Sequence, residues 1–253
     1  MVYNNVQVTG RVILQTDDRR LRIFQDFGDV VQQFFEDSYF NNTLKLMMGF
    51  QWSVEYCTNA RFLAFFDDDY FVNIKNVVGM LKTVKPTEFG NTVIGYVWNN
   101  AMPFRIKDSK WYISLQEYPY RFFPPYVTAG SFFVPMMTAE RLYIAMQYTK
   151  IIRFDDVFLG IVAWKLKTQL LHNPNLYFYH LPYDVFKYRK VIASHGFDDQ
   201  EFLYKAWKEQ TELDSVNVAW ECMDCCYVVS CKHCDVFEDF CWLKDRRSHR
   251  KFR

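Results

Sequence analysis

Three consecutive aspartates, Asp67, Asp68 and Asp69, directly follow the apolar run Phe62–Phe66. A continuous apolar run of this length predicts a strand that is buried on both faces, and ligands of open α/β sheets bind beyond the carboxyl ends of the strands. If the strand continued through the acids, its two-residue period would turn Asp67 and Asp69 to one side and Asp68 to the other. Such oxygen ligands suit Mg²⁺ or Mn²⁺. We therefore expect a divalent metal here; the alternative is a solvated acidic turn.

A second acidic pair, Asp155 and Asp156, precedes the apolar segment Val157–Gly160. Carboxylates in the first turn of a helix are favoured by the helix dipole, and N-capping explains one of them more readily than two. A carboxylate in apolar surroundings has a raised pKa and is a better proton acceptor. The pair is therefore interpreted either as a helix cap or as the position of a general base.

An aromatic segment lies between the two acidic motifs and offers flat faces that suit the apolar side of a sugar ring. Its aromatic residues are Trp98, Phe104, Trp111, Tyr112, Tyr118, Tyr120, Phe122, Phe123 and Tyr126, with Pro119, Pro124 and Pro125 among them. Core packing uses the same residue types, and for any single aromatic it is the favoured interpretation.

The rest of the chain predicts alternating strands and helices, and so an α/β sheet flanked by helices. Strands are expected at 62–66 and 92–97, with short apolar runs in 6–15 and a further strand beginning at 29–31. Helices are expected from Asn41 or Asn42, around Val77 to a point before Pro86, from Thr138 and from Asp199. Pro135 is expected to interrupt a strand.

Composition narrows the classes of function. The 253 residues are 50% hydrophobic and 19% aromatic, which supports a substantial core in one large domain or two small ones. The formal net charge of +1 gives no global field for nucleic acid, so a small or neutral ligand is expected. No run of the sequence has the length of a membrane span, and the residues after Met1 do not form a signal sequence.

The composition changes after about Glu212, which divides the chain into a region 1–212 and a cysteine-rich, basic tail 213–253. Six of the seven cysteines lie in this tail, at positions 222, 225, 226, 231, 234 and 241. The two Cys-x-x-Cys pairs are closer together than in ordinary zinc sites, so zinc and disulfides remain equally open.

Taken in order, these motifs resemble the β-1,3-glycosyltransferases of glycosyltransferase family 31, and most of all their Brainiac type. The matching segments are Phe27–Gln32, Asp37–Lys45, Trp52, Cys57, Asp67–Asn73, Pro103, Arg105, Lys110–Ser114, Tyr118–Pro119, Pro125–Tyr126, Ala129–Gly130, Asp155–Val157, Gly160 and Ser194–Asp199. The resemblance implies a GT-A fold, a UDP-sugar donor, Mn²⁺ or Mg²⁺, and inversion at the anomeric carbon. The transferred hexose would be galactose or N-acetylglucosamine, and the acceptor a 3-hydroxyl of a glycan on a glycolipid or glycoprotein.

The resemblance also implies roles on the donor side of the site. Asp69 and His195 would ligate the metal, and Asp67 and Asp68 would contact the nucleotide ribose or the water shell of the metal.

On the acceptor side, Asp156 would take the proton from the attacking hydroxyl, and Asp155 would orient the loop or the acceptor. Arg105, Lys110 and Trp111 fall in the region that holds the acceptor and the donor sugar.

The resemblance places such enzymes on the lumenal side of the Golgi membrane, held by an anchor that this sequence does not contain. Asn41 opens a glycosylation sequon, Asn41-Asn42-Thr43, which would be used in a secretory compartment. Part of the family pattern, a first strand and helix that help to hold the nucleotide, has no match here. We therefore expect a partial catalytic domain with weak donor binding; the alternative is a remnant that serves as a binding or partner module.

Overall fold

The computed structural model describes residues 31, 35 and 38–221, with side chains in the last helix described to residue 213. Its elements are η1 (Tyr39–Asn41), α2 (Asn42–Tyr56), β1 (Phe62–Phe66), β2 (Tyr70–Val72), α3 (Ile74–Leu81), η2 (Pro86–Glu88), β3 (Thr92–Trp98), β4 (Tyr126–Pro135), α4 (Met136–Gln147), α5 (Asp155–Lys165), β5 (Gln169–His172), β6 (Leu176–His180), η3 (Lys187–Lys190), β7 (Ala193–His195) and α6 (Gln200–Glu221). The apolar runs in 6–15, residues 29–30 of the strand expected to begin at 29–31, and the cysteines of the tail lie outside the described residues; Val31 is described and is not in a strand.

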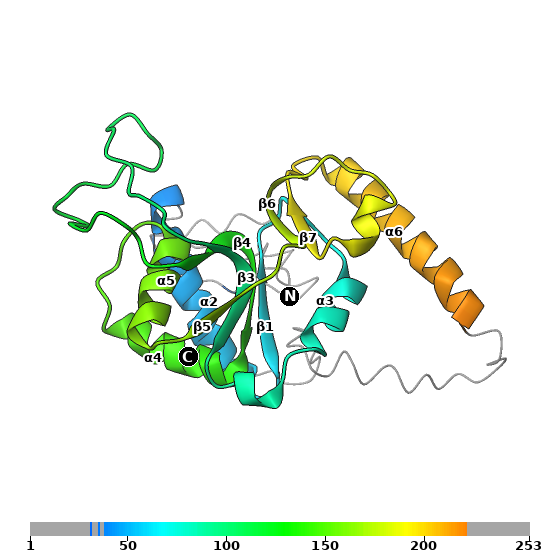
Figure 1. Ribbon diagram of the computed structural model, residues 1–253, viewed down its shortest axis with the longest axis horizontal. Helices are drawn as coiled ribbons and strands as arrows, with labels where there is room; N and C mark the ends of the chain where they lie inside the picture. Colours follow the sequence, from blue (N-terminus) through cyan, green and yellow to red (C-terminus); the bar gives the residue numbers. More distant parts are fainter. Residues whose placement is uncertain (1–30, 32–34, 36–37, 222–253) are drawn as a thin grey trace, which may run out of the picture.

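Two sheets organise the described chain (Figure 1). The larger has the order β1-β4-β3-β5, in which β4 runs antiparallel to β1 and β3 while β3 and β5 are parallel. The smaller has the order β2-β7-β6. Helices α2, α4 and α5 cover one face of the large sheet, and α3 lies toward the opposite face. The expected α/β sheet flanked by helices is confirmed.

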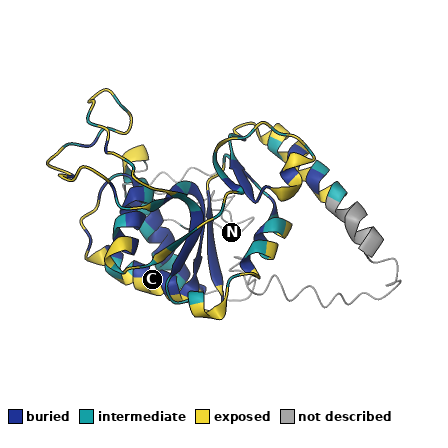
Figure 2. Ribbon diagram, viewed as in Figure 1, coloured by how far each residue is buried: buried dark blue, intermediate teal, exposed yellow. Residues whose placement is uncertain are grey.

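The buried run of β1 separates two hydrophobic cores, which explains why it is apolar at every position (Figure 2). Phe62 and Phe66 face the core beneath α3, whereas Phe65 faces the core beneath α2, α4 and α5. There the ring of Phe65 stacks between Phe50 and Phe132, at centroid distances of 4.9 and 4.6 Å. Burying each such ring contributes about 1.5–3 kcal/mol, so the strand is held firmly from both sides.

The sequence predicted no bounds for β4, which is central in the large sheet. Its residues do not alternate between polar and apolar, because both faces are covered. Pro135 was expected to interrupt a strand, but it is the last residue of β4 and pairs with Phe62. Helix α4 then begins at Met136, two residues before the expected Thr138. Proline is tolerated here because the strand ends there.

The three aspartates do not continue β1, so the expected alternation of Asp67, Asp68 and Asp69 is wrong. The chain turns instead: the backbone N–H of Tyr70 donates to the carbonyl of Asp67 at 3.3 Å. The turn lets β2 leave the large sheet and join the small one. It also gives the three carboxylates different surroundings, since Asp67 and Asp68 are exposed and Asp69 is half-buried.

Within the described part of the chain, we find no helix with both the length and the apolar character of a membrane span.

Candidate active site

Asp69 and His195 lie far apart in the sequence and meet through the pairing of β2 with β7. In this ladder Tyr70 stands opposite His195. The carbonyl of Asp69 accepts hydrogen bonds from the backbone N–H groups of Gly196 and Phe197 at 3.1 and 2.9 Å. These contacts hold the carboxylate of Asp69 beside the ring of His195, with Oδ2 3.0 Å from Nε2. The two side chains expected to share a metal are therefore neighbours.

The surroundings of Asp69 fit a divalent cation. Its second oxygen, Oδ1, is buried and has no hydrogen-bond partner among the described residues, an arrangement that costs free energy unless another group binds it. One carboxylate and one imidazole supply only two ligands, and no group of three or more His, Cys, Asp or Glu side chains suitable for a metal occurs in the described residues. Such a metal would need oxygens from phosphate or water to complete its shell.

Asp67 lies next to this pair in an electrostatically unfavourable position. The protein atoms packed around it, followed by the charges of Asp155, Asp69 and Asp68, raise the pKa of its carboxyl to about 7. The side chain nevertheless reaches solvent. Four acids from two separate motifs thus converge, which indicates that a cation or a hydrogen-bond donor belongs among them.

Asp155 and Asp156 form the first turn of α5, as expected. The carboxylate of Asp156 accepts a hydrogen bond from the N–H of Val157 at 2.7 Å, and the backbone N–H of Ala129 also bonds to it. Burial raises the pKa of both aspartates, with the charge of Asp156 adding to the effect on Asp155. Asp156 therefore binds an N–H group in the first turn of α5, as a capping residue does. It can also accept a proton at near-neutral pH.

The backbone at Ala129 and Gly130 in β4 connects the two groups of acids. The carbonyl of Gly130 accepts from the N–H of Asp67 at 3.0 Å, and the carbonyl of Ala129 accepts from the hydroxyl of Tyr70 at 3.3 Å. Gly130 has a φ of +84°, and a Cβ atom there would lie 2.4 Å from the Tyr70 ring. Only glycine combines this backbone with this close approach.

Helix α5 approaches β4 equally closely. A Cβ atom on Gly160 would lie 2.5 Å from Cβ of Tyr126, so glycine lets the middle of α5 pack against the beginning of β4. The charges of Asp67, Asp69 and Asp156 all add to the effect of burial in raising the pKa of Tyr70. Tyr70 therefore lies between the metal-binding candidates and the candidate base, although the motif Asp67–Asn73 that contains it implied no chemical role for this residue.

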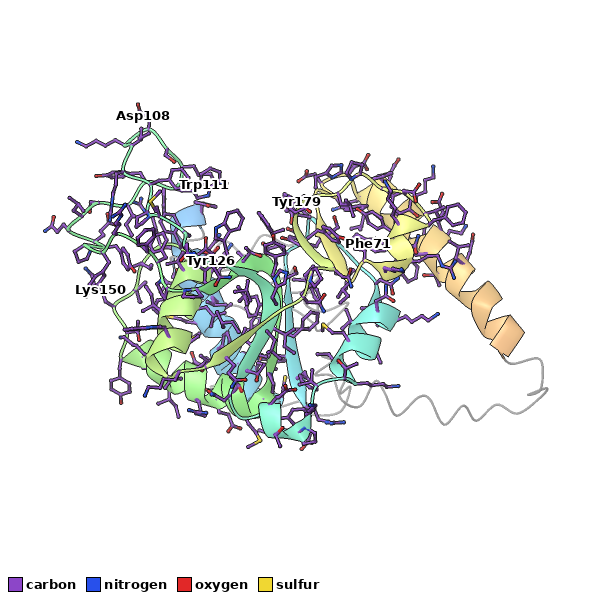
Figure 3. All side chains as sticks on the ribbon, viewed as in Figure 1. Phe71, Asp108, Trp111, Tyr126, Lys150 and Tyr179 are labelled. Carbon is purple, nitrogen blue, oxygen red and sulfur yellow. The ribbon has the colours of Figure 1, made fainter. Side chains whose placement is uncertain are left out.

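The long loop between β3 and β4, residues 99–125, carries the other expected site residues. The guanidinium of Arg105 donates to the carbonyls of Ile113, Tyr118 and Tyr120 at 2.7, 2.7 and 3.1 Å. These bonds hold the loop together from within. Trp111 is 52% exposed, and its ring lies 5.7 Å from that of Phe104. Figure 3 shows Trp111 on the same side of the molecule as Tyr126, above the start of α5.

Asn41, the expected glycosylation site, ends η1 and is half-buried. The sequon threonine, Thr43, is buried and donates to the carbonyl of Ile152 at 2.6 Å. Glycosylation of Asn41 stays a prediction.

The position of Arg105 predicts that its substitution weakens binding of the acceptor. Arg105→Lys keeps the charge but loses the planar set of donors that reaches three carbonyls, so we expect a less ordered loop. The Michaelis constant for the acceptor should rise about tenfold, whereas UDP affinity should stay unchanged. Steady-state kinetics and UDP calorimetry measure the two quantities. A variant with wild-type acceptor kinetics would show that the loop does not depend on these bonds.

The raised pKa values predict how stability depends on pH without metal. Folded Asp67, Asp155 and Asp156 bind protons more tightly than the unfolded chain does, where the pKa is about 3.9. Their contribution is full below that unfolded value and is lost as pH rises through the folded values, near 7 for Asp67. We expect the melting temperature to fall between about pH 5 and pH 8.

Asp67→Asn is the matched variant for this measurement by scanning calorimetry, because it removes one of the three groups. We expect a shallower fall than in the wild type. An unchanged slope, or a melting temperature that rises over this range, would contradict the assignment.

The chain is similar in sequence to known proteins. The family model described as Galactosyltransferase matches residues 15–174. Beta-1,3-galactosyltransferase brn of Drosophila melanogaster is 41% identical over 187 residues, covering 73% of this chain and 57% of the fly protein. The human UDP-GalNAc:beta-1,3-N-acetylgalactosaminyltransferase 1 is 38% identical over 181 residues, covering 70% of this chain and 54% of the human protein.

A third relative is the lactosylceramide 1,3-N-acetyl-beta-D-glucosaminyltransferase of Xenopus tropicalis, 36% identical over 191 residues, or 74% of this chain and 49% of that protein. Among solved structures, a glycosyltransferase involved in the glycosylation of the major capsid of PBCV-1 aligns with a TM-score of 0.32 and 11% identity over 82% of this chain and 97% of that one, which is too weak to bear on the fold. This chain spans about half the length of the curated relatives it matches. With the family model matching more than half of its residues, the chain belongs to the galactosyltransferase family.

Proposed function

We propose that this chain transfers a hexose, galactose or N-acetylglucosamine, from a UDP-sugar to a 3-hydroxyl of an acceptor glycan on a glycolipid or glycoprotein, with inversion at the anomeric carbon. One observation carries the proposal. Two pairs of side chains flank the same short piece of β4 backbone: Asp69 with His195, and Asp155 with Asp156. A transferase needs its donor site and its general base to lie close together in this way. The β-1,3-glycosyltransferase names of the relatives support the linkage.

On the donor side, Asp69 and His195 would hold Mn²⁺, or Mg²⁺, with Asp67 and Asp68 near the ribose or the water of the metal. The buried, unpartnered Oδ1 of Asp69 is the observation that supports a cation at this place. A bound metal neutralises charge on the diphosphate as UDP departs. A site with an imidazole beside a carboxylate favours Mn²⁺ over Mg²⁺, because Mg²⁺ prefers oxygen ligands.

On the acceptor side, Asp156 would accept the proton of the attacking hydroxyl. That oxygen forms a bond to the anomeric carbon, the bond from this carbon to the UDP oxygen breaks, and UDP leaves with the bonding electrons. Burial raises the pKa of Asp156 toward neutrality, where a base is most effective. Asp155 would orient the acceptor or the loop. A single displacement of this kind inverts the anomeric configuration.

We also propose that the chain works on the lumenal side of the Golgi membrane. Cys57 is disulfide-bonded, a state typical of oxidising compartments, and the sequon at Asn41 fits such a location. Membrane association through an anchor is part of the family pattern and belongs to the same proposal. Co-localisation of the tagged protein with a Golgi marker tests it; a cytosolic distribution would reject it.

The transfer reaction itself is tested with the full chain, Mn²⁺, a panel of UDP-hexoses and β-linked glycoside acceptors. We expect product from UDP-galactose or UDP-N-acetylglucosamine, and none after chelation of the metal. UDP binding with no transfer from any donor would instead identify the chain as a binding module that keeps the donor site.

A further inference from the structure

Three aromatic side chains from the two sheets meet at the carboxyl end of β3. Trp98 is the last residue of β3, and its ring centroid lies 5.1 Å from that of Phe178 in β6. The ring of Tyr96 lies 4.8 Å from the same phenylalanine and 6.5 Å from Trp98. We call Tyr96, Trp98 and Phe178 the aromatic wall. It joins the large sheet to the small one through side chains.

The aromatic wall reaches solvent, although a core would bury residues of this kind. Trp98 is 40% exposed, and Tyr179, whose ring lies 5.2 Å from that of Phe178, is 45% exposed. Ile94 lies on the same face of β3 by the two-residue period of a strand, but it is 4% exposed and belongs to the core beneath α3. Figure 3 shows Tyr179 on the small sheet, on the side toward Tyr126. The apolar face therefore continues from the core to an open surface, as ligand-binding surfaces do.

The aromatic wall adjoins the candidate site in both sheets. In the large sheet, Trp98 pairs with Tyr126, the first residue of β4, which packs against α5. In the small sheet, Phe178 stands two residues before His180, which pairs with His195. The wall therefore borders the candidate site from the strand next to α5 to the strand next to β7.

The distance along β4 favours the acceptor over the donor as the ligand of the wall. Ala129 and Gly130 connect the two groups of acids, and Tyr126 precedes Ala129 by three residues, about 10 Å of extended strand. The hexose of the donor is bonded to the diphosphate, so it stays close to the metal and the base. The wall lies farther out and is open, so a glycan attached to a lipid or protein can leave the site across it.

His172 adds a polar group beside the aromatic wall. Its Nδ1 accepts a hydrogen bond from the backbone N–H of Val97 at 3.1 Å, and its ring lies 4.8 Å from that of Tyr96. The proton of the neutral imidazole is then on Nε2, which can donate. The side chain is exposed. Aromatic faces with a few directed polar groups are typical of sites that bind sugars.

We propose that the aromatic wall binds the second sugar of the acceptor glycan, the one that carries the sugar under attack. Its ring stacks on Trp98 and Phe178, and His172 donates a hydrogen bond to one of its hydroxyls. This inference rests on the proposed function, since it assumes that the acceptor reaches Asp156. It gives the wall no part in binding the UDP-hexose. The wall then makes an acceptor of two sugars a better substrate than one of a single sugar.

The length of the acceptor separates this role from a structural one. Trp98→Ala should raise the Michaelis constant for a disaccharide glycoside about five- to tenfold, because it removes most of the stacking surface. The constants for the matching monosaccharide glycoside and for the UDP-hexose should stay within about twofold of the wild type. Trp98→Phe keeps a ring and should lie between the two. Trp164→Ala, which changes an exposed tryptophan near the end of α5, is the control.

Three results of this comparison would overturn the inference. The first is an unchanged disaccharide constant in Trp98→Ala, and the second is an equal rise for the monosaccharide and the disaccharide. The third is a rise in the constant for the UDP-hexose, which would place the donor sugar at the wall. Should Trp98→Ala not fold, Trp98→Phe carries the same comparison. None of these results counts against the proposed function while the wild type transfers.

A second test does not need turnover. In saturation-transfer NMR of the full chain with UDP, Mn²⁺ and the disaccharide, protons of the second sugar should receive saturation from the wild type. The transfer should be several-fold smaller for Trp98→Ala and for Phe178→Ala, and the double variant should lose little more, because the two rings form one surface. Absent transfer in the wild type, or equal transfer in the wild type and both variants, would overturn the inference. A wild type that binds the disaccharide in this way but transfers no hexose would count against the proposed function alone.

Discussion

Asp156→Asn should lower the rate of transfer by at least about 100-fold, the usual contribution of a positioned base. The amide is nearly isosteric, and its oxygen can still accept the hydrogen bond from the N–H of Val157, so the first turn of α5 should keep its position. What it cannot do is take a proton from the acceptor hydroxyl. UDP affinity should therefore remain at the wild-type value in titration calorimetry.

The pH dependence adds a second criterion for the base. Because burial raises the pKa of Asp156, the wild-type rate at subsaturating acceptor should fall as pH decreases through a value well above that of an ordinary aspartate. Asp108→Ala, which changes an exposed acid on the loop, is the control and should behave as the wild type. Loss of UDP binding in Asp156→Asn would show that the residue is structural rather than catalytic.

Asp69→Ala should abolish the effect of Mn²⁺ on UDP binding. The carboxylate is one of two protein ligands that the structure offers, and its Oδ1 has no other hydrogen-bond partner among the described residues. Without it the cation loses its anchor on the protein, and the diphosphate loses the cation. In the wild type we expect UDP affinity to drop at least about 100-fold on removal of Mn²⁺, which corresponds to about 2.7 kcal/mol.

His195→Ala tests the second ligand in the same titration. The imidazole supplies a single coordination bond, so we expect a smaller loss, with Mn²⁺ still improving binding at higher concentration. Asp108→Ala again serves as the control for removal of a negative charge. Equal UDP affinity of the wild type with and without Mn²⁺ would reject the metal assignment of both residues.

The sequence predicted those parts of the site that lie next to a strand or helix end. Asp67–Asp69 follow an apolar run, and Asp155 and Asp156 precede one, so local patterns located them correctly at the end of β1 and the start of α5. The pattern could not show that the chain turns at Asp67, because a turn made by backbone hydrogen bonds leaves no periodic signal.

Other parts of the site depend on contacts between distant segments. The resemblance named Asp69 and His195 together, and the register of β2 and β7 explains their proximity. The motif Asp67–Asn73 includes Tyr70 but implied no role for it; in the structure its hydroxyl bonds to the carbonyl of Ala129 in β4, next to both groups of acids. The sequence also did not show that Arg105 and Trp111 have different places in the loop. Arg105 bonds to backbone carbonyls inside the loop, whereas Trp111 is exposed on its surface. These distinctions arise from tertiary packing, which a single sequence does not display.

The most direct test of the account is the anomeric configuration and linkage of the product, read by NMR after the full chain has reacted with a UDP-hexose, Mn²⁺ and a glycoside acceptor. A single attack assisted by Asp156 on a donor held through Asp69 and His195 predicts a β-linkage to the 3-hydroxyl of the acceptor, formed from the α-configured donor and lost on chelation of the metal. A product with the donor's configuration retained, or the same product formed without a divalent metal, would contradict it.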